Sequence, residues 1–253
     1  MFDLARYPSY QVFMGVVTAL VACAVLFPLW IRLLRFRNIG QQVRADGPQG
    51  HLVKQGTPTM GGVLILLVIM AVYFLFAEVT RLSLLALGAM LLCGILGFLD
   101  DWSKVARERS LGLTPRAKIL GQGFVALLFG LLAVNWASLP TTITLPLIPG
   151  AVDLGAVTTV VPVAGFAIAI PWLYLALVFI MIVGESNAVN LTDGLDGLAA
   201  GTVMIVMLAY AGIAFRQNHL DTAMLAASVA GACVGFLWYN SYPADIFMGD
   251  TGS

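Results

Sequence analysis

Charged residues are scarce in this chain: 13 Lys and Arg and 13 Asp and Glu make up 10% of its 253 residues, whereas 60% of the residues are hydrophobic. An average soluble domain carries about 25% charged residues, so the composition predicts an integral membrane protein. The net charge is zero, which argues against a nucleic acid as a partner. The chain has only three cysteines, all inside apolar runs, which is typical of small buried residues and excludes a disulfide framework.

Several catalytic signatures are also absent from the sequence. It has no P-loop, no GxGxxG, no GxSxG, and no His or Cys set with the spacing of a zinc site. ATP hydrolysis by a standard P-loop, dinucleotide chemistry and zinc catalysis are therefore not first choices.

Long apolar runs are abundant instead, and seven of them are long enough to cross a bilayer as helices. They are Val12–Trp30, Gly61–Ala77, Leu82–Leu99, Ile119–Ala137, a stretch that ends near Gly184, Gly197–Phe215 and Thr222–Tyr239. The predicted fold class is an all-α polytopic membrane protein, with residues 1–253 in a single transmembrane domain. Between spans four and five, residues 138–162 are rich in Thr, Val and Pro, which predicts a short extracytoplasmic β-hairpin or an extended cap.

Basic residues are distributed unevenly over the two sides that seven spans define. One side holds Arg32, Arg35, Arg37, Arg44, Lys54, Lys104, Arg107, Arg109, Arg116 and Lys118, and the other holds only Arg6, Arg81 and Arg216. This positive-inside bias predicts an N-terminus outside and basic loops in the cytoplasm.

Acidic residues return to the same predicted cytoplasmic side, although the positive-inside bias says nothing about acids. They are Asp100, Asp101, Glu185, Asp193, Asp196, Asp245 and Asp250. Ionisable groups at a membrane boundary are costly without a role, so this recurrence suggests a site that handles a cation or a phosphate.

The pair Asp100 and Asp101 directly follows span three, at a helix end where the dipole disfavours negative charge. A structural role is the alternative: Lys104, four residues on, can pair with Asp100 on an exposed turn, or one aspartate can cap the next segment. Taken alone, the pair slightly favours the structural role.

The segment before span six spaces four polar side chains at intervals of three: Asn187, Asn190, Asp193 and Asp196. On a regular helix they would fan across half the circumference, but Gly194 and Gly197 favour a broken or loop-like backbone. Amides beside carboxylates can bind a base or ribose while the acids hold a metal or a hydroxyl. A capping and turn cluster could use one of the acids but hardly all four groups, so binding is favoured.

Two further loops are ambiguous on their own. Lys54 lies in a Gly- and Pro-rich loop before span two, where a lysine suits a phosphate but ordinary turn chemistry is equally typical. Asp250 lies between glycines in MGDTGS, which fits a Mg²⁺ ligand or an ordinary turn.

Four motifs, taken in order, resemble the bacterial phospho-N-acetylmuramoyl-pentapeptide transferases of the polyprenyl-phosphate N-acetylhexosamine-1-phosphate transferase superfamily (glycosyltransferase family 4). They are GTPTMGG before span two, DDWSK after span three, NAVNLTDGLDGLA before span six and MGDTGS after span seven. The DDxxK pattern alone is loose, whereas NLTDGLDGLA together with TPTMGG is specific and favours the muramoyl branch. The resemblance covers essentially the whole chain.

The resemblance implies an activity in the bacterial cytoplasmic (inner) membrane, with the active site facing the cytoplasm. Such enzymes transfer phospho-MurNAc-pentapeptide from UDP-MurNAc-pentapeptide to undecaprenyl phosphate with Mg²⁺, giving lipid I and UMP. Membrane lipids are further partners, and pairing with a second copy of the chain stays open. The alternatives are a transferase that takes UDP-GlcNAc, an ion-coupled transporter, disfavoured because the acids gather at one membrane edge, and an inactive scaffold.

The resemblance also implies roles for individual residues. Asp250 would be the main Mg²⁺ ligand, with Asp101 as a second ligand. Asp100 and Asp101 would lie beside the reacting phosphates, one of them acting as a base or as a nucleophile. The implied substrate-binding residues are Lys54, Thr59, Asn187, Asn190, Asp193, Asp196, Asn240, Phe247, Gly249, Lys104 and Lys118.

One departure from the family concerns length. Family members have ten spans and a histidine-rich motif in a later cytoplasmic loop, whereas this sequence stops at Ser253 with seven spans. We therefore expect a fragment of a longer protein, incomplete at its C-terminus and inactive by itself. Strong Mg²⁺-dependent UMP release from residues 1–253 alone would contradict that expectation.

Overall fold

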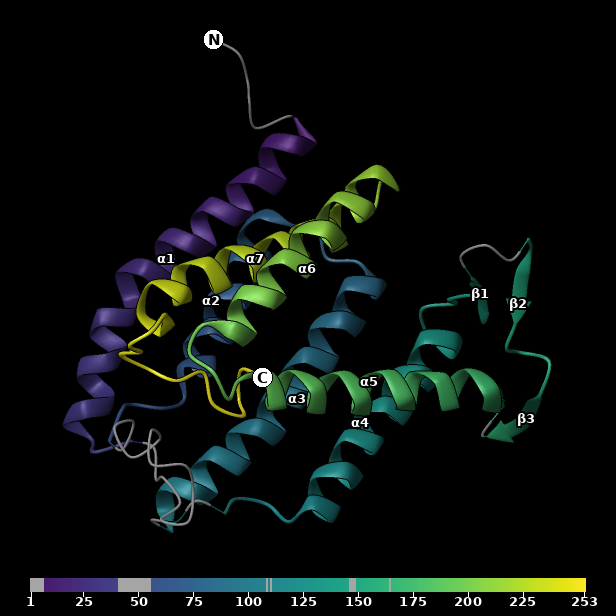
Figure 1. The fold of residues 1–253 in the computed structure, drawn as a ribbon. Helices are drawn as coiled ribbons and strands as arrows, with labels where there is room; N and C mark the ends of the chain where they lie inside the picture. The colour runs from purple at the N-terminus through teal and green to yellow at the C-terminus, as the bar shows by residue number, and fades with distance from the viewer. Residues whose placement is uncertain (1–6, 41–55, 108, 110, 146–148, 164) are drawn as a thin grey trace.

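The computed structural model describes residues 7–40, 56–107, 109, 111–145, 149–163 and 165–253, and these form a bundle of helices with two small hairpins at one end (Figure 1). The helices are α1 (Pro8–Phe36), α2 (Gly61–Phe76), α3 (Arg81–Ala106), α4 (Pro115–Asn135), α5 (Trp172–Thr192), α6 (Leu198–Arg216) and α7 (Leu220–Asn240). The strands are β1 (Thr142–Thr144), β2 (Ala151–Asp153), β3 (Thr158–Val163) and β4 (Phe166–Pro171).

The predicted polytopic helical fold is confirmed in the described part of the chain. Six of its helices are long and apolar enough to cross a membrane. The exception is α2, whose 16 residues rise about 24 Å at 1.5 Å per residue, somewhat less than a hydrocarbon core of about 30 Å. Each helix corresponds to one of the seven predicted spans.

Helix α7 is the centre of the bundle and packs between α1 and α6. Its most apolar window is 67% buried, against 11% for α5. Small residues make this packing close: a Cβ on Gly231 would lie 2.2 Å from the Val16 carbonyl oxygen, and one on Gly235 would lie 2.5 Å from that of Leu20. The four-residue spacing of these glycines is typical of close helix contacts in membranes. Cys23 and Cys233 are free and buried in this core, as predicted, whereas Cys93 in α3 is free and only half-buried.

Helix α3 ends later than the sequence predicted. The predicted span stops at Leu99, but the helix continues to Ala106, so Asp100 and Asp101 lie inside it. Hydropathy marks the limit of the apolar segment rather than the end of the helix, and no helix breaker follows Leu99.

The region between α4 and α5 forms two antiparallel hairpins rather than one, β1 with β2 and β3 with β4. The second reaches Pro171, nine residues beyond the predicted limit. Its strand β4, FAIAIP, is apolar and is continuous in hydropathy with α5, which is why the sequence did not separate them. Asn135 at the end of α4 exchanges two hydrogen bonds with the backbone of Ala169, which attaches this hairpin to the bundle.

The chain alternates direction, so the ends of α3, α5 and α7 and the starts of α2, α4 and α6 lie at the end of the bundle opposite the hairpins. The final segment, residues 247–253, reaches this end as well: the amides of Gly61 and Gly62 donate to the carbonyls of Phe247 and Met248 at 2.9 and 2.8 Å. The predicted acidic loops therefore meet at one place.

Candidate active site

Three carboxylates form a cluster at this end of the bundle. Asp100 and Asp101 come from the last turns of α3 and are 2% and 3% exposed. Asp250 comes from the loop after α7, and one oxygen of each carboxylate lies within 4.8 Å of the others. Tertiary folding thus brings together all three predicted catalytic residues across some 150 positions of sequence.

Asp101 fixes the loop that carries Asp250. Its Oδ1 accepts a hydrogen bond from the Asp250 amide at 3.0 Å, and its Oδ2 accepts from the Thr251 amide at 2.9 Å and the Thr251 hydroxyl at 2.7 Å. A carboxylate that accepts several such bonds is strongly oriented. The Asp101 side chain therefore positions its neighbour in the cluster.

Asp100 is held by an ion pair and by a backbone hydrogen bond. Its Oδ2 lies 2.6 Å from Lys104 Nζ, and its Oδ1 accepts from the Leu113 amide at 2.7 Å, just before α4. The ion pair is the one that the structural alternative predicted, but the expected exposed turn is wrong, because Asp100 is buried. The hydrogen bond to Leu113 links α3 to the start of α4.

Two lysines neutralise much of the charge of the cluster. Lys104 Nζ lies 2.9 Å from Asp250 Oδ1 and 3.7 Å from Asp101 Oδ1. Lys118 in α4 forms a close ion pair with Asp250 Oδ2 and lies 4.0 Å from Asp100 Oδ1. Burial alone would raise the pKa of Asp250, but its interactions with Asp100 and the two ammonium groups hold that pKa well below its usual range.

The donor set fits a hard divalent cation. Carboxylate oxygens are the ligands that Mg²⁺ prefers, with water completing the shell. The Asp250 side chain is 14% exposed, against 3% for those of Asp100 and Asp101, so it is the most open of the three. Both oxygens of Asp101 accept hydrogen bonds from residues 250 and 251, and both oxygens of Asp250 pair with lysines. The greater exposure of its side chain is therefore what favours Asp250 as the candidate for the principal metal ligand.

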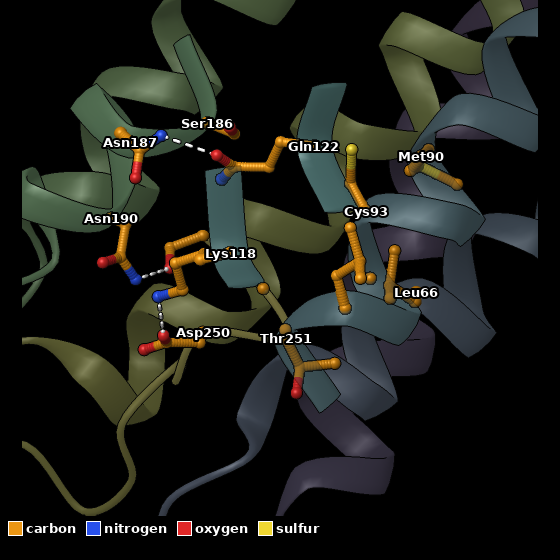
Figure 2. A pocket seen from close by; sticks show the side chains of 15 residues that line it. Leu66, Met90, Cys93, Lys118, Gln122, Ser186, Asn187, Asn190, Asp250 and Thr251 are labelled. Atoms are coloured by element: carbon orange, nitrogen blue, oxygen red, sulfur yellow. Dashed lines mark hydrogen bonds and ion pairs between the residues drawn. The ribbon is translucent and has the colours of Figure 1, made fainter. Parts of the chain in front are cut away.

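A cavity of about 150 Å³ opens beside the cluster (Figure 2). Its polar wall carries Lys118, Asn187, Asn190 and Asp250, and its apolar wall comes from α2 and α3, through residues that include Leu66, Met90 and Cys93. Asn190 donates to the Ser253 hydroxyl at 2.9 Å, and Asn187 donates to Gln122 Oε1 at 2.8 Å. Both predicted amides thus lie at the cavity, on α5.

The predicted broken backbone begins later than expected. Helix α5 continues to Thr192, and Asp193 is its C-cap, so the two amides lie on regular helix. Burial, opposed by a backbone hydrogen bond from Gly249 and assisted by the negative charges of Asp250, Asp101 and Asp196, raises the pKa of Asp193 to about 7. Asp196 accepts from the Ala244 amide at 3.3 Å. Gly194 and Gly197 thus lie after the end of α5 and do not break the helix at the two amides.

Three of the predicted substrate-binding residues lie in the two loops that flank the cluster. Gly249 has a φ of +77°, and a Cβ there would lie 2.7 Å from Asp101 Oδ2, so both its conformation and its space call for glycine. Phe247 is 8% exposed, and its amide donates to the Pro58 carbonyl at 2.8 Å. Thr59 follows Pro58 and is half-buried. Lys54 lies outside the described residues.

Asn240 lies apart from the carboxylates and links two loops. Its Oδ1 accepts from the Gly197 amide at 3.0 Å, and its Nδ2 donates to the Ile246 carbonyl at 3.0 Å. The side chain is 2% exposed, and these bonds join the start of α6 to the loop that leads to Asp250.

Replacing Asn240 by alanine is expected to destabilise the protein. The change would leave a buried amide and a buried carbonyl without these partners, and each such loss costs about 1–3 kcal/mol. We expect a lower midpoint of thermal unfolding in detergent, with Gln217→Ala, at the exposed C-cap of α6, as the control. An unchanged midpoint would contradict the linking role.

The sequence analysis did not predict several polar residues at the site, among them Thr251 and Gln122. Thr251 is next to Asp250 in the MGDTGS motif, and its hydroxyl bonds to Asp101. Gln122 is 7% exposed within α4, and a lone amide inside an apolar run is a signal that could have found it.

Known proteins resemble the chain over most of its length. Residues 83–253 match the model of glycosyl transferase family 4, and residues 54–66 match signature 1 of phospho-N-acetylmuramoyl-pentapeptide-transferase. The phospho-N-acetylmuramoyl-pentapeptide-transferase of Frankia casuarinae is 44% identical over 96% of this chain and 72% of its own length. The enzyme of Halalkalibacterium halodurans is 44% identical over 94% of this chain and 69% of its own length. The enzyme of Bacillus licheniformis is 42% identical, with the same coverage of both chains. The chain belongs to glycosyl transferase family 4, and within it to the phospho-N-acetylmuramoyl-pentapeptide-transferases.

Proposed function

We propose that this protein transfers phospho-MurNAc-pentapeptide from UDP-MurNAc-pentapeptide to undecaprenyl phosphate, releasing UMP and forming lipid I. The observation that carries the proposal is the cluster of Asp100, Asp101 and Asp250 with Lys104 and Lys118. Family membership supplies the reaction, and the cluster supplies groups of the right chemistry for it.

The reaction exchanges one phosphoanhydride for another. An oxygen of the lipid phosphate forms a bond to the sugar-linked phosphorus, and the bond from that phosphorus to the oxygen of UMP breaks. Both substrates are anionic, so the reaction needs positive charge and exact positioning more than covalent help from the protein. Lys104 and Lys118 are compact point charges suited to phosphate oxygens.

The carboxylates have separable tasks in this proposal. Asp250 would be the principal ligand of Mg²⁺, which would neutralise phosphate charge when bound. Asp101 orients the Asp250 loop, and Asp100 holds Lys104 and the start of α4.

The position of the cluster at one end of the bundle suits substrates of opposite solubility. The nucleotide would come from water past the turn at Asp193 and Asp196, and the lipid phosphate from the bilayer. The excess of Lys and Arg on this side supports a cytoplasmic orientation in the bacterial inner membrane, with the N-terminus outside.

The proposal is tested with the complete product of the gene in proteoliposomes that contain undecaprenyl phosphate. With UDP-MurNAc-pentapeptide and Mg²⁺ we expect release of UMP and formation of a lipid-linked product. EDTA is expected to lower the rate by at least about 100-fold, because a metal contributes several kcal/mol to such a barrier, and added Mg²⁺ to restore it.

UDP-GlcNAc is the comparison substrate in the same vesicles. Turnover of UDP-GlcNAc without turnover of the muramoyl substrate would reject the proposed donor in favour of its rival. Full activity in EDTA would reject the role of Mg²⁺.

A further inference from the structure

The segment that carries Asp250 is enclosed by two helices that have no side chain at the contact. On one side is Gly62 in the first turn of α2, and on the other is Gly97 in α3, one turn before the aspartate pair. The Gly62 amide donates to the Met248 carbonyl at 2.8 Å, which uses one of the amides that a helix N-terminus leaves without a partner.

Both contacts are between backbones. A Cβ on Gly97 would lie 1.9 Å from the Asp250 carbonyl oxygen and 2.7 Å from the Thr251 nitrogen. A Cβ on Gly62 would lie 2.2 Å from the Gly252 nitrogen and 2.4 Å from its Cα. A side chain could rotate away from such a clash, but a backbone that is held on its other side cannot. The segment itself would have to move.

The required movement is large on the scale of an active site. Moving the Asp250 carbonyl from 1.9 Å to an ordinary contact of 3.4 Å takes about 1.5 Å, and a misplacement of about 1 Å can cost about 100-fold in rate. The same movement would lengthen the bonds from the Asp250 and Thr251 amides to Asp101, now 3.0 and 2.9 Å.

We propose that Gly62 and Gly97 are positioning residues, forming a two-sided socket that fixes the Asp250 carboxylate against Asp101 and Lys118. Glycine has no side chain, so the pattern of polar and charged residues in the sequence does not indicate this socket. The inference rests on the proposed function for its kinetic consequence only, because the position of the segment can be measured without turnover.

Gly97→Ala tests the socket, with Gly88→Ala as the matched control. Gly88 lies on the same helix, and a Cβ there would meet nothing within 4 Å. Gly62→Ala is the second test, with Gly201→Ala of α6 as its control, since Gly201 also has open space. All four are single additions of a methyl group to a helix, in the complete gene product.

The first readout is hydrogen exchange of the peptide that contains residues 247–253. We expect the Asp250 and Thr251 amides to exchange at least about tenfold faster in Gly97→Ala and Gly62→Ala, with no change in the controls. The second readout is turnover against Mg²⁺ concentration. We expect turnover about 100-fold lower and half-saturation at a higher Mg²⁺ concentration, whereas a smaller folded fraction would lower turnover without moving half-saturation.

The possible results distinguish the positioning role of the two glycines from a role in the fold and from the proposed function. Unchanged exchange and half-saturation in both socket variants would overturn the positioning role. Loss of folded protein in both, with normal controls, would also overturn it, because the glycines would then serve the fold. Faster exchange in the socket variants of a protein whose wild type has no turnover would support the socket and reject the proposed function.

Discussion

Replacement of Asp250 by asparagine is expected to lower turnover by about three orders of magnitude or more and to leave the fold intact. The amide keeps the shape of the side chain but removes the negative charge that faces Lys104 and Lys118 at the cluster. The two ammonium groups then face two carboxylates instead of three, and the site loses its most open anionic oxygen ligand, so the affinity for Mg²⁺ falls. Losses of this size are typical for single catalytic groups.

The measurement combines UMP release with Mn²⁺ binding followed by electron paramagnetic resonance. Asp245→Asn is the matched control, because Asp245 lies in the same loop, 63% exposed, in a surface ion pair with Arg35 at 3.6 Å that contributes little. Turnover of Asp250→Asn near the wild-type rate would remove Asp250 from the metal role, and equal losses in both variants would indicate a loop defect.

Replacement of Asp101 by asparagine is expected to cause the next largest loss of turnover. It is also expected to lower the stability of the protein. Asp101 accepts from two amides and one hydroxyl, and an asparagine offers one acceptor oxygen and one donor group. At least one of these buried donors would face the new NH₂ group. We expect a loss of about 1–3 kcal/mol of stability and about 100-fold or more in turnover.

Thr251→Val provides the graded comparison. It removes only the hydroxyl bond to Asp101 and keeps both amide bonds, so its losses are expected to be smaller in both thermal midpoint and turnover. Equal stability of Asp101→Asn and the wild type would mean that Asp101 does not hold the Asp250 loop. A larger effect of Thr251→Val would reverse the proposed order.

The sequence predicted the cluster because its parts recur after apolar runs of spanning length. Asp100, Asp101 and Asp250 all follow such runs on the predicted cytoplasmic side, and alternation of spans then brings them to one end. Periodic and compositional signals of this kind act over 15–25 residues, the scale on which hydrophobic transfer to a bilayer selects helices. The motifs further specified the family.

The sequence did not separate residues that bind from residues that hold the binding residues. Asn240 and Asp101 were both predicted at the site, but Asn240 joins the start of α6 to the 246 loop and Asp101 orients the segment that carries Asp250. A polar residue in a motif is the same residue type whether it binds a ligand or holds a neighbouring residue, so the sequence does not distinguish the two roles. Its hydrogen-bond partners distinguish the two roles, and most of those partners are distant in the sequence.

The sequence alone determined the membrane class, the helices and the set of carboxylates, because apolar length and charge are properties of local segments. The tertiary structure alone decided how far α3 and α5 continue as helices, that Lys118 pairs with Asp250, and that the segment of Asp250 packs against Gly62 and Gly97. These features depend on distances between segments of the chain. For example, a Cβ on Gly97 would lie only 1.9 Å from the Asp250 carbonyl oxygen. No pattern along one segment contains that information.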